Sequence, residues 1–180
     1  SPLFLICALI IKLTDVGTIF YISRRVGVRG EHFNFPKFRS MSMDSEKIKK
    51  LLDDTNQHGK GAVTFKMKKD PRVTPFGTWM RRFSFDELPQ LYCVLIGSMS
   101  LVGPRPPTQD EVDQYSLEDR HRLDVKPGIT CIWQVSGRAE IPFPIQVKMD
   151  LEYVRNRSLF LDLSILFKTI PAVLSGKGAY

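Results

Sequence analysis

The feature that most constrains the fold is an apolar run near the start of the chain, residues 3–11, which ends at Lys12. As a helix this run would be roughly 14 Å long, at about 1.5 Å per residue, whereas a helix that crosses a bilayer needs about 20 residues. The run alone is therefore too short to span a membrane. Two interpretations stay open: it is the second half of a re-entrant or spanning helix that is kinked at Pro2, or it is a buried helix of the core.

The rest of the sequence changes between strand and helix periodicity, which predicts one α+β domain that is mostly helical. The length of 180 residues and the hydrophobic content of 43% fit a single folded domain. Aromatic and β-branched residues on both sides of a turn predict an N-terminal β-hairpin with strands over residues 20–26 and 32–41. Residues 129–135 are predicted as a short strand or extended run. Helical spacing predicts helices over residues 44–57, 74–82, 84–96, 108–122, 145–157 and 159–174.

Two details of these predicted helices carry further information. Thr108 and Glu111 match a capping box at the start of one of them, which supports a helix N-terminus there. The last predicted helix has a wide apolar face, which suits either the membrane interface or the protein core.

The formal net charge of +7 favours an anionic partner, which nucleic acid, an anionic membrane or a phosphorylated substrate would each provide. The sequence shows no zinc-finger spacing, RNA-recognition signature or continuous basic helix, which argues against nucleic acid. Its cysteines and histidines lack metal-ligand spacing, which argues against a structural zinc site. Neither a P-loop motif nor a G-x-G-x-x-G motif after a strand is present, so phosphate binding by either motif is excluded.

The adjacent carboxylates Asp86 and Glu87 are the first candidates for chemistry. They lie near a predicted helix start, where the helix dipole favours ionised acids, and neighbouring side chains on a helix point about 100° apart. One carboxylate could therefore attack a substrate while the other holds a metal. The alternative is structural, because Ser84 and Glu87 match a capping box in which Glu87 accepts from the Ser84 backbone N–H. Pro89 weakens this alternative, since within the second turn it would remove a helical hydrogen bond.

Arginines on both sides of this pair in the sequence are candidates for phosphate binding. Arg105 lies between two prolines, and a guanidinium on a stiff loop loses little entropy when it binds a phosphate through two hydrogen bonds. Arg81 and Arg82 lie about one turn before Asp86, where a positive charge would keep the carboxylate ionised and attract a pyrophosphate. For each group the open alternative is an ordinary solvated arginine.

Five short motifs occur in order along the chain, at residues 37–41 (KFRSM), 86–91 (DELPQL), 100–106 (SLVGPRP), 126–130 (KPGIT) and 133–138 (WQVSGR). Together they resemble the bacterial sugar transferase family, the monotopic polyprenol-phosphate phosphoglycosyl transferases. Each motif is weak alone, but five in register are specific, and they extend the resemblance over nearly the whole chain. One departure is Cys131, where many members of the family have glycine.

The resemblance implies a membrane-associated, re-entrant N-terminal helix that is broken at a Ser-Pro pair, which Ser1-Pro2 is similar to. Residues 1–19 would then be the second half of that helix and its exit. Residues 20–180 would form the catalytic domain, on the cytoplasmic face of the bacterial inner membrane, against the inner leaflet.

Roles for single residues also follow from the resemblance. It implies that Asp86 is the catalytic nucleophile and that Glu87 is the ligand of a Mg2+ cofactor. It implies phosphate-binding roles for a group of basic residues and a place in the substrate pocket for two further residues: Arg105, Arg81 and Lys37 for phosphate, and Gln134 and Arg138 for the pocket.

The implied reaction transfers a phosphosugar from a UDP-sugar to polyprenol (undecaprenyl) phosphate and releases UMP, through a covalent aspartyl-phosphosugar intermediate. It would be the first membrane step of exopolysaccharide, capsule or O-antigen synthesis. The charged β-phosphate repels a carboxylate, so neutralisation by Mg2+ and arginines would allow Asp86 to attack. The alternative function is a catalytically inactive lipid-binding scaffold of a glycan assembly complex, against which the intact Asp86–Glu87 pair argues. The sequence leaves open which sugar is transferred and whether the chain forms a homo-oligomer.

Overall fold

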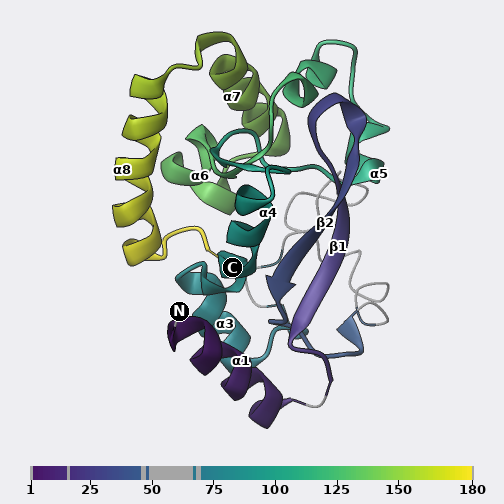
Figure 1. The fold of residues 1–180 in the computed structure, drawn as a ribbon, viewed down its shortest axis with the longest axis vertical. Helices are drawn as coiled ribbons and strands as arrows, with labels where there is room; N and C mark the ends of the chain where they lie inside the picture. The colour runs from purple at the N-terminus through teal and green to yellow at the C-terminus, as the bar shows by residue number, and fades with distance from the viewer. Residues whose placement is uncertain (1, 16, 46–47, 49–66, 68–69, 180) are drawn as a thin grey trace.

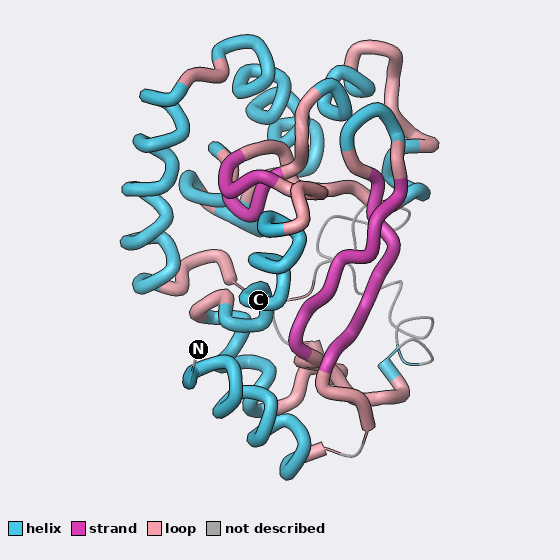
Figure 2. The backbone as a smooth tube through the Cα atoms, viewed as in Figure 1, coloured by secondary structure: helices cyan, strands magenta, loops and turns pink. Residues whose placement is uncertain are grey.

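The computed structural model describes residues 2–15, 17–45, 48, 67 and 70–179 of the chain. A long hairpin runs along one side of the molecule, and most of the helices, though not α5, lie on the other side (Figure 1). In the described part of the chain, strands are confined to this hairpin and one short parallel pair, as Figure 2 shows. The predicted class, a mostly helical α+β chain with an N-terminal β-hairpin, is confirmed.

The hairpin consists of β1 (Phe20–Val26) and β2 (His32–Phe38), which pair antiparallel along their full length. A 3-10 turn, η1 (Val28–Gly30), joins them, and its last residue, Gly30, has a φ of 82°. Glycine adopts such a left-handed conformation at low cost, which explains the residue at this turn.

The second strand ends at Phe38, short of the predicted end at residue 41. Beyond this point the chain leaves β1 and hydrogen-bonds to a different segment: Thr74 donates its backbone N–H to the Ser40 carbonyl at 3.0 Å. Met41 forms an isolated antiparallel bridge with Val73. This exchange of partners brings the end of the hairpin against the helix that follows Thr74.

Helix α1 (Pro2–Thr14) covers one end of the molecule. Its inner face buries Cys7 and Ile11 against Phe38 and Met80. Its outer face exposes large apolar side chains, which are Leu5, Ile6, Leu9 and Leu13. None of the helices traced through the described residues is both long enough and apolar enough to cross a membrane.

The segment that follows is not the continuous helix predicted over residues 84–96. Helix α3 (Pro75–Arg82), capped by the Thr74 hydroxyl, ends before Ser84, whose φ of 57° is left-handed. A 3-10 helix, η3 (Phe85–Gln90), then precedes the short α4 (Leu91–Leu95). The left-handed residue and the missing N–H of the proline within η3 explain why an α-helix does not form there.

The predicted helix over residues 108–122 is also divided. Its capping box is confirmed, since the Thr108 hydroxyl and Glu111 carboxylate each accept from the other's backbone N–H, but α5 ends after four residues (Gln109–Val112). The second piece is η4 (Asp119–Asp124). Ser116 and Asp119 exchange side-chain to backbone hydrogen bonds at 3.1 Å, which start this new turn.

Two very short strands, β3 (Ser100–Val102) and β4 (Gly128–Thr130), pair in parallel to the left of the hairpin in Figure 2. Their backbones approach so closely that a Cβ on Gly128 would lie 2.1 Å from the Gly103 nitrogen. The strand predicted over residues 129–135 is confirmed only at its start, since β4 ends at Thr130. Helix α6 (Ile132–Ser136) replaces the rest, because the chain turns away from β3 after Thr130.

The C-terminal part follows the prediction more closely. After η5 (Arg138–Glu140), α7 (Phe143–Asn156) and α8 (Leu159–Ser175) occupy the two predicted helical segments within two residues at each end. Ile165 anchors α8 against Val102 and Tyr153, whereas its outer apolar residues, Leu159, Phe160, Phe167 and Leu174, are exposed. The helix predicted over residues 44–57 lies almost entirely outside the described residues.

Candidate active site

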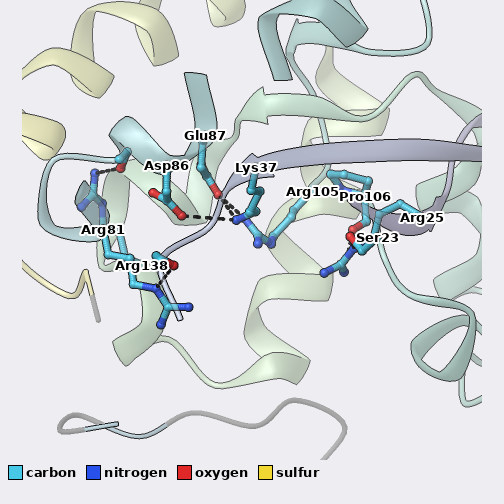
Figure 3. A network of polar contacts seen from close by, with 11 residues as sticks. Ser23, Arg25, Lys37, Arg81, Asp86, Glu87, Arg105, Pro106 and Arg138 are labelled. Atoms are coloured by element: carbon cyan, nitrogen blue, oxygen red, sulfur yellow. Dashed lines mark hydrogen bonds and ion pairs between the residues drawn. The ribbon is translucent and has the colours of Figure 1, made fainter. Parts of the chain in front are cut away.

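A cavity of about 730 Å³ lies between the hairpin, the α3–η3 segment and the C-terminal helices. Asp86 and Glu87 line it from η3, and Lys37 lines it from β2. Arg105 reaches it from the loop after β3. Charged groups from three distant segments of the sequence therefore meet around the two adjacent carboxylates, as the close view in Figure 3 shows.

The local backbone explains how both carboxylates face this cavity. Ser84 takes the left-handed conformation and its side chain caps nothing in η3, although its carbonyl accepts from the Glu87 N–H at 3.2 Å. The Glu87 carboxylate instead reaches residues of other segments. The capping-box alternative for Ser84 and Glu87 is thus wrong, because a left-handed Ser84 cannot serve as the extended N-cap that the motif requires.

Glu87 is held by two cations. Lys37 Nζ donates to Glu87 Oε1 at 2.6 Å, and Arg105 Nη1 donates to the same oxygen at 3.2 Å. Burial alone would raise the pKa of Glu87, but the charges of Lys37 and Arg105 outweigh it and hold the pKa far below its usual range. Glu87 is therefore ionised near neutral pH.

Asp86 is the less restrained carboxylate. Its Oδ2 lies 3.8 Å from Lys37 Nζ, and within the described residues its side chain accepts no hydrogen bond. Burial raises the pKa of Asp86 above its usual range, and the positive charge of Lys37 only partly offsets this. A carboxylate that is more basic and free of hydrogen bonds is better suited to attack an electrophile than one with two charged donors.

Two further arginines lie on the Asp86 side of the pair (Figure 3). Arg81 Nε donates to the Ser40 hydroxyl at 2.9 Å, which fixes the side chain between α3 and the end of the hairpin. Arg138 Nη2 donates to the Ser84 hydroxyl at 3.3 Å. Burial lowers the pKa of Arg138, against the effect of the two carboxylates, but an arginine remains charged at any physiological pH.

The structure brings every predicted site residue except Arg82 to one cavity. Gln134, whose Oε1 accepts from the Cys131 thiol at 3.1 Å, lines it from α6. Arg82 is exposed and is absent from the lining, unlike its neighbour Arg81. The predicted residues that line the cavity are Lys37, Arg81, Asp86, Glu87, Arg105, Gln134 and Arg138.

Comparison with known families agrees with this arrangement. A family model described as "Bacterial sugar transferase" matches residues 1–176, which is nearly the entire chain. The chain belongs to the bacterial sugar transferase family.

Similar curated proteins carry names of the same kind. The chain is 42% identical to the exopolysaccharide production protein ExoY of Rhizobium meliloti, over 100% of this chain and 80% of ExoY. It is 45% identical to the undecaprenyl-phosphate galactose phosphotransferase of Salmonella typhimurium, over 92% of this chain and 35% of that protein. It is 40% identical to the UDP-glucose:undecaprenyl-phosphate glucose-1-phosphate transferase of Xanthomonas campestris, over 99% of this chain and 36% of that protein. The chain thus spans about a third of the length of these longer relatives.

Arg25 is one basic cavity residue of this bacterial sugar transferase that was not among the predicted site residues. Arg25 Nη1 donates to the Pro106 carbonyl at 3.3 Å, and its guanidinium lies over the Phe35 ring at 5.4 Å. The available signal was strand periodicity: Lys37 pairs with Tyr21, and alternate residues of β1 from Tyr21 onward share its face. Arg25 is on that face, beside the loop that carries Arg105.

The side chains of the cavity also indicate whether a metal ion could bind there. No group of three or more acidic, histidine or cysteine side chains able to hold a metal is present in the described ranges. Mg2+ in phosphate-transferring sites, however, is commonly bound by one or two carboxylates together with substrate phosphates and water. Asp86 and Glu87 are two adjacent carboxylates at a cavity rich in cations, so this part of the transferase fits a Mg2+ ion that arrives with its phosphate ligand.

Proposed function

We propose that this protein transfers a phosphosugar from a UDP-sugar to polyprenol phosphate and releases UMP. The observation that supports it most is the asymmetric carboxylate pair, in which Glu87 is tied by Lys37 and Arg105 while Asp86 has no hydrogen bond within the described residues. The names of the relatives, which include a UDP-glucose:undecaprenyl-phosphate glucose-1-phosphate transferase, support the same substrate classes.

The proposed reaction has two steps, with Asp86 as the nucleophile. In the first, an Asp86 carboxylate oxygen forms a bond to the β-phosphorus of the UDP-sugar, and the bond from that phosphorus to the bridging oxygen breaks. UMP leaves with the electron pair, and the phosphosugar remains on Asp86. In the second, a phosphate oxygen of the polyprenol phosphate attacks the same phosphorus and the Asp86 carboxylate leaves. The product is a polyprenyl diphosphate sugar.

The basic residues around the pair offset the negative charge of the phosphates. Arg105 and Arg25 lie on the Glu87 side, and Arg81 and Arg138 lie on the Asp86 side (Figure 3). An arginine can hold a phosphate through two parallel hydrogen bonds, and at fixed positions it stabilises the charge that develops in transfer. A diphosphate placed across Asp86 would therefore have cations near both of its phosphates.

Glu87 is the proposed Mg2+ ligand, assisted by Asp86 or by substrate oxygens. When bound, Mg2+ would neutralise phosphate charge and polarise the phosphorus–oxygen bonds. Lys37 contributes from the protein itself, because its Nζ lies 2.6 Å from Glu87 and 3.8 Å from Asp86 and so holds the two carboxylates in a fixed relation.

Membrane attachment is part of the same proposal. Polyprenol phosphate is embedded in a bilayer, and α1 exposes Leu5, Leu9 and Leu13 on the face that does not pack against the core. We propose that α1 is the second half of a re-entrant helix in the inner leaflet, and that the cavity opens at the cytoplasmic face.

The test is UMP release from a panel of UDP-sugars, with polyprenol phosphate and Mg2+ present and with the protein in detergent or lipid. We expect release with at least one UDP-sugar and formation of a lipid-linked diphosphate sugar. Lipid binding without UMP release from any UDP-sugar would instead favour the inactive scaffold.

A further inference from the structure

The chain segment after α8, residues 176–179, lies against the site directly behind Arg138. Gly176 ends α8 with a left-handed φ of 63°. The chain then returns toward η5, where the Gly178 carbonyl accepts a hydrogen bond from the Ala139 N–H at 3.2 Å. Both Gly178 and Ala179 line the cavity. The end of the sequence therefore forms part of the wall of the site.

This segment packs on the Arg138 turn without spare room. A Cβ on Gly178 would lie 2.5 Å from the Gly137 carbonyl oxygen and 3.1 Å from the Arg138 Cβ. Gly178 also has a left-handed φ of 66°. Glycine is needed at this position both for its conformation and for the close approach, so the position of the segment fixes the position of the turn.

Arg138 has the features of a residue that is held in place for a ligand. Its φ of 54° is left-handed, a conformation that costs energy for residues other than glycine and persists only where the surroundings impose it. One of its terminal nitrogens, Nη2, donates to Ser84, whose own φ is 57°. The other, Nη1, is buried and finds no acceptor among the described residues. A buried donor without an acceptor is costly, and a ligand oxygen in the cavity that Arg138 lines would satisfy it once the guanidinium turns this nitrogen toward the cavity.

We infer that residues 176–179 are a positioning element that holds Arg138 so that its Nη1 donates to a phosphate oxygen of the substrate. The inference rests on the proposed function, which supplies phosphate as the ligand class. The relevant oxygen belongs either to the diphosphate of the UDP-sugar or to the phosphate of the polyprenol. Arg138 would touch the substrate, whereas Gly178 would act only through Arg138.

The test compares Gly178→Ala with a matched control, Gly30→Ala. Both glycines have a left-handed φ, 66° and 82°, so alanine strains both backbones alike, but a Cβ on Gly30 would meet nothing within 4 Å. We expect Gly178→Ala and Arg138→Ala each to raise the KM of one substrate about tenfold or more, as loss of a charged hydrogen bond does. Gly30→Ala should leave both KM values unchanged. The double variant Gly178→Ala/Arg138→Ala should match Arg138→Ala alone.

Two half-reactions identify the phosphate. Adduct formation on the protein is followed with UDP-sugar alone, and discharge of the preformed adduct is followed with polyprenol phosphate alone. An effect confined to the first assigns Arg138 to the donor diphosphate, and an effect confined to the second assigns it to the lipid phosphate.

Three results would overturn the inference. The first is that Gly178→Ala and Gly30→Ala give the same KM values in both half-reactions, and the second is that Gly178→Ala raises the KM equally in the presence and absence of Arg138. The third is that Arg138→Ala leaves both KM values unchanged. If Gly178→Ala lowers the melting temperature so far that it cannot be assayed, a chain that ends at Ser175 replaces it and should equal Arg138→Ala. A truncated chain with KM values of the intact chain would refute the inference. Failure of the proposed function looks different, because the unmodified chain would then release no UMP.

Discussion

The Asp86–Glu87 site and the Arg122–Asp150 pair both place buried carboxylates beside arginine, but they differ in how the charges are matched. Arg122 Nη2 lies 2.6 Å from Asp150 Oδ2, and the two residues are only 4% and 0% exposed. Arg122 also donates to the Tyr115 hydroxyl, and its guanidinium lies over the Tyr115 and Phe143 rings. One cation meets one anion there, and aromatic side chains close the pair off.

The site around Asp86 has the opposite character. Five basic residues surround two carboxylates, and all of them border a cavity: Arg25, Lys37, Arg81, Arg105 and Arg138. Such an excess of positive charge is unfavourable unless an anion completes it, whereas a pair of one cation and one anion carries no net charge. The contrast separates a cluster that serves binding and chemistry from one that serves the fold, and substitutions in the two should differ in what they disturb.

The largest effect is expected for Asp86→Asn. An amide cannot form the acyl phosphate, so turnover should fall by about 10⁴-fold or more, and the covalent adduct should be absent. Intact-protein mass spectrometry after addition of UDP-sugar without lipid acceptor measures the adduct directly. An adduct that survives in Asp86→Asn would exclude Asp86 as the nucleophile.

Asp150→Asn is the matched control from the structural pair. It removes the same charge, but its amide N–H group would face buried donors in place of an oxygen that accepts, such as the one bonded to Arg122 Nη2, and an unsatisfied buried polar group costs about 1–3 kcal/mol. We expect a lower unfolding free energy with adduct formation retained in the folded fraction. Loss of the adduct in a folded Asp150→Asn protein would show that the two clusters are not separable.

Glu87→Gln should have the second largest effect. Glutamine keeps an acceptor oxygen but loses the charge that Lys37 and Arg105 face, so turnover should fall by about 100-fold and the Mg2+ requirement should rise. A Mg2+ titration of UMP release measures both. Full activity at an unchanged Mg2+ concentration would exclude Glu87 as a metal ligand.

Arg105→Lys should have a smaller but clear effect at the Asp86–Glu87 site. Lysine keeps the charge but loses the planar fork that binds a phosphate through two hydrogen bonds, so turnover should fall roughly tenfold or more with the fold intact. Arg82→Lys is the matched control, because Arg82 is exposed and does not line the cavity. Equal activities of the two variants would mean that Arg105 is not a bidentate phosphate ligand.

Part of the Asp86–Glu87 site could be predicted from the sequence. The motif resemblance pointed to Asp86, Glu87 and Arg105, and strand periodicity predicted the hairpin that carries Lys37. The different restraint of the two carboxylates was not predictable, since it depends on Lys37, 50 residues away in sequence, and Arg105, 18 residues away. Ionic contacts between such distant segments leave no local pattern.

The wrong predictions of helix length were local and share one reason. Apolar spacing predicted long helices over residues 84–96 and 108–122, but side-chain hydrogen bonds at Ser116 interrupt the second, and the left-handed Ser84 and the proline within η3 replace the first half of the other with a 3-10 helix. Helix periodicity records which residues are buried and is insensitive to such interruptions. At Ser84 the interruption is what turns Asp86 and Glu87 toward the cavity.

The smallest expected effect is a pH dependence of the unfolding free energy, which tests the Arg122–Asp150 pair. Burial, only partly offset by Arg122, raises the pKa of Asp150 to about 6, whereas the pKa of Glu87 is lowered. A carboxyl with a raised pKa in the folded state binds its proton more tightly there, so its contribution to stability is fully present below its unfolded pKa and is lost as pH rises through about 6. Glu87, with its lowered pKa, should contribute no change between pH 5 and 7.

The unfolding free energy of the unmodified chain should therefore rise by about 1 kcal/mol more than that of Asp150→Asn between pH 7 and pH 5, measured by denaturant titration. Parallel pH profiles for the two proteins would mean that Asp150 stays ionised in the fold, as a fully compensated ion pair would.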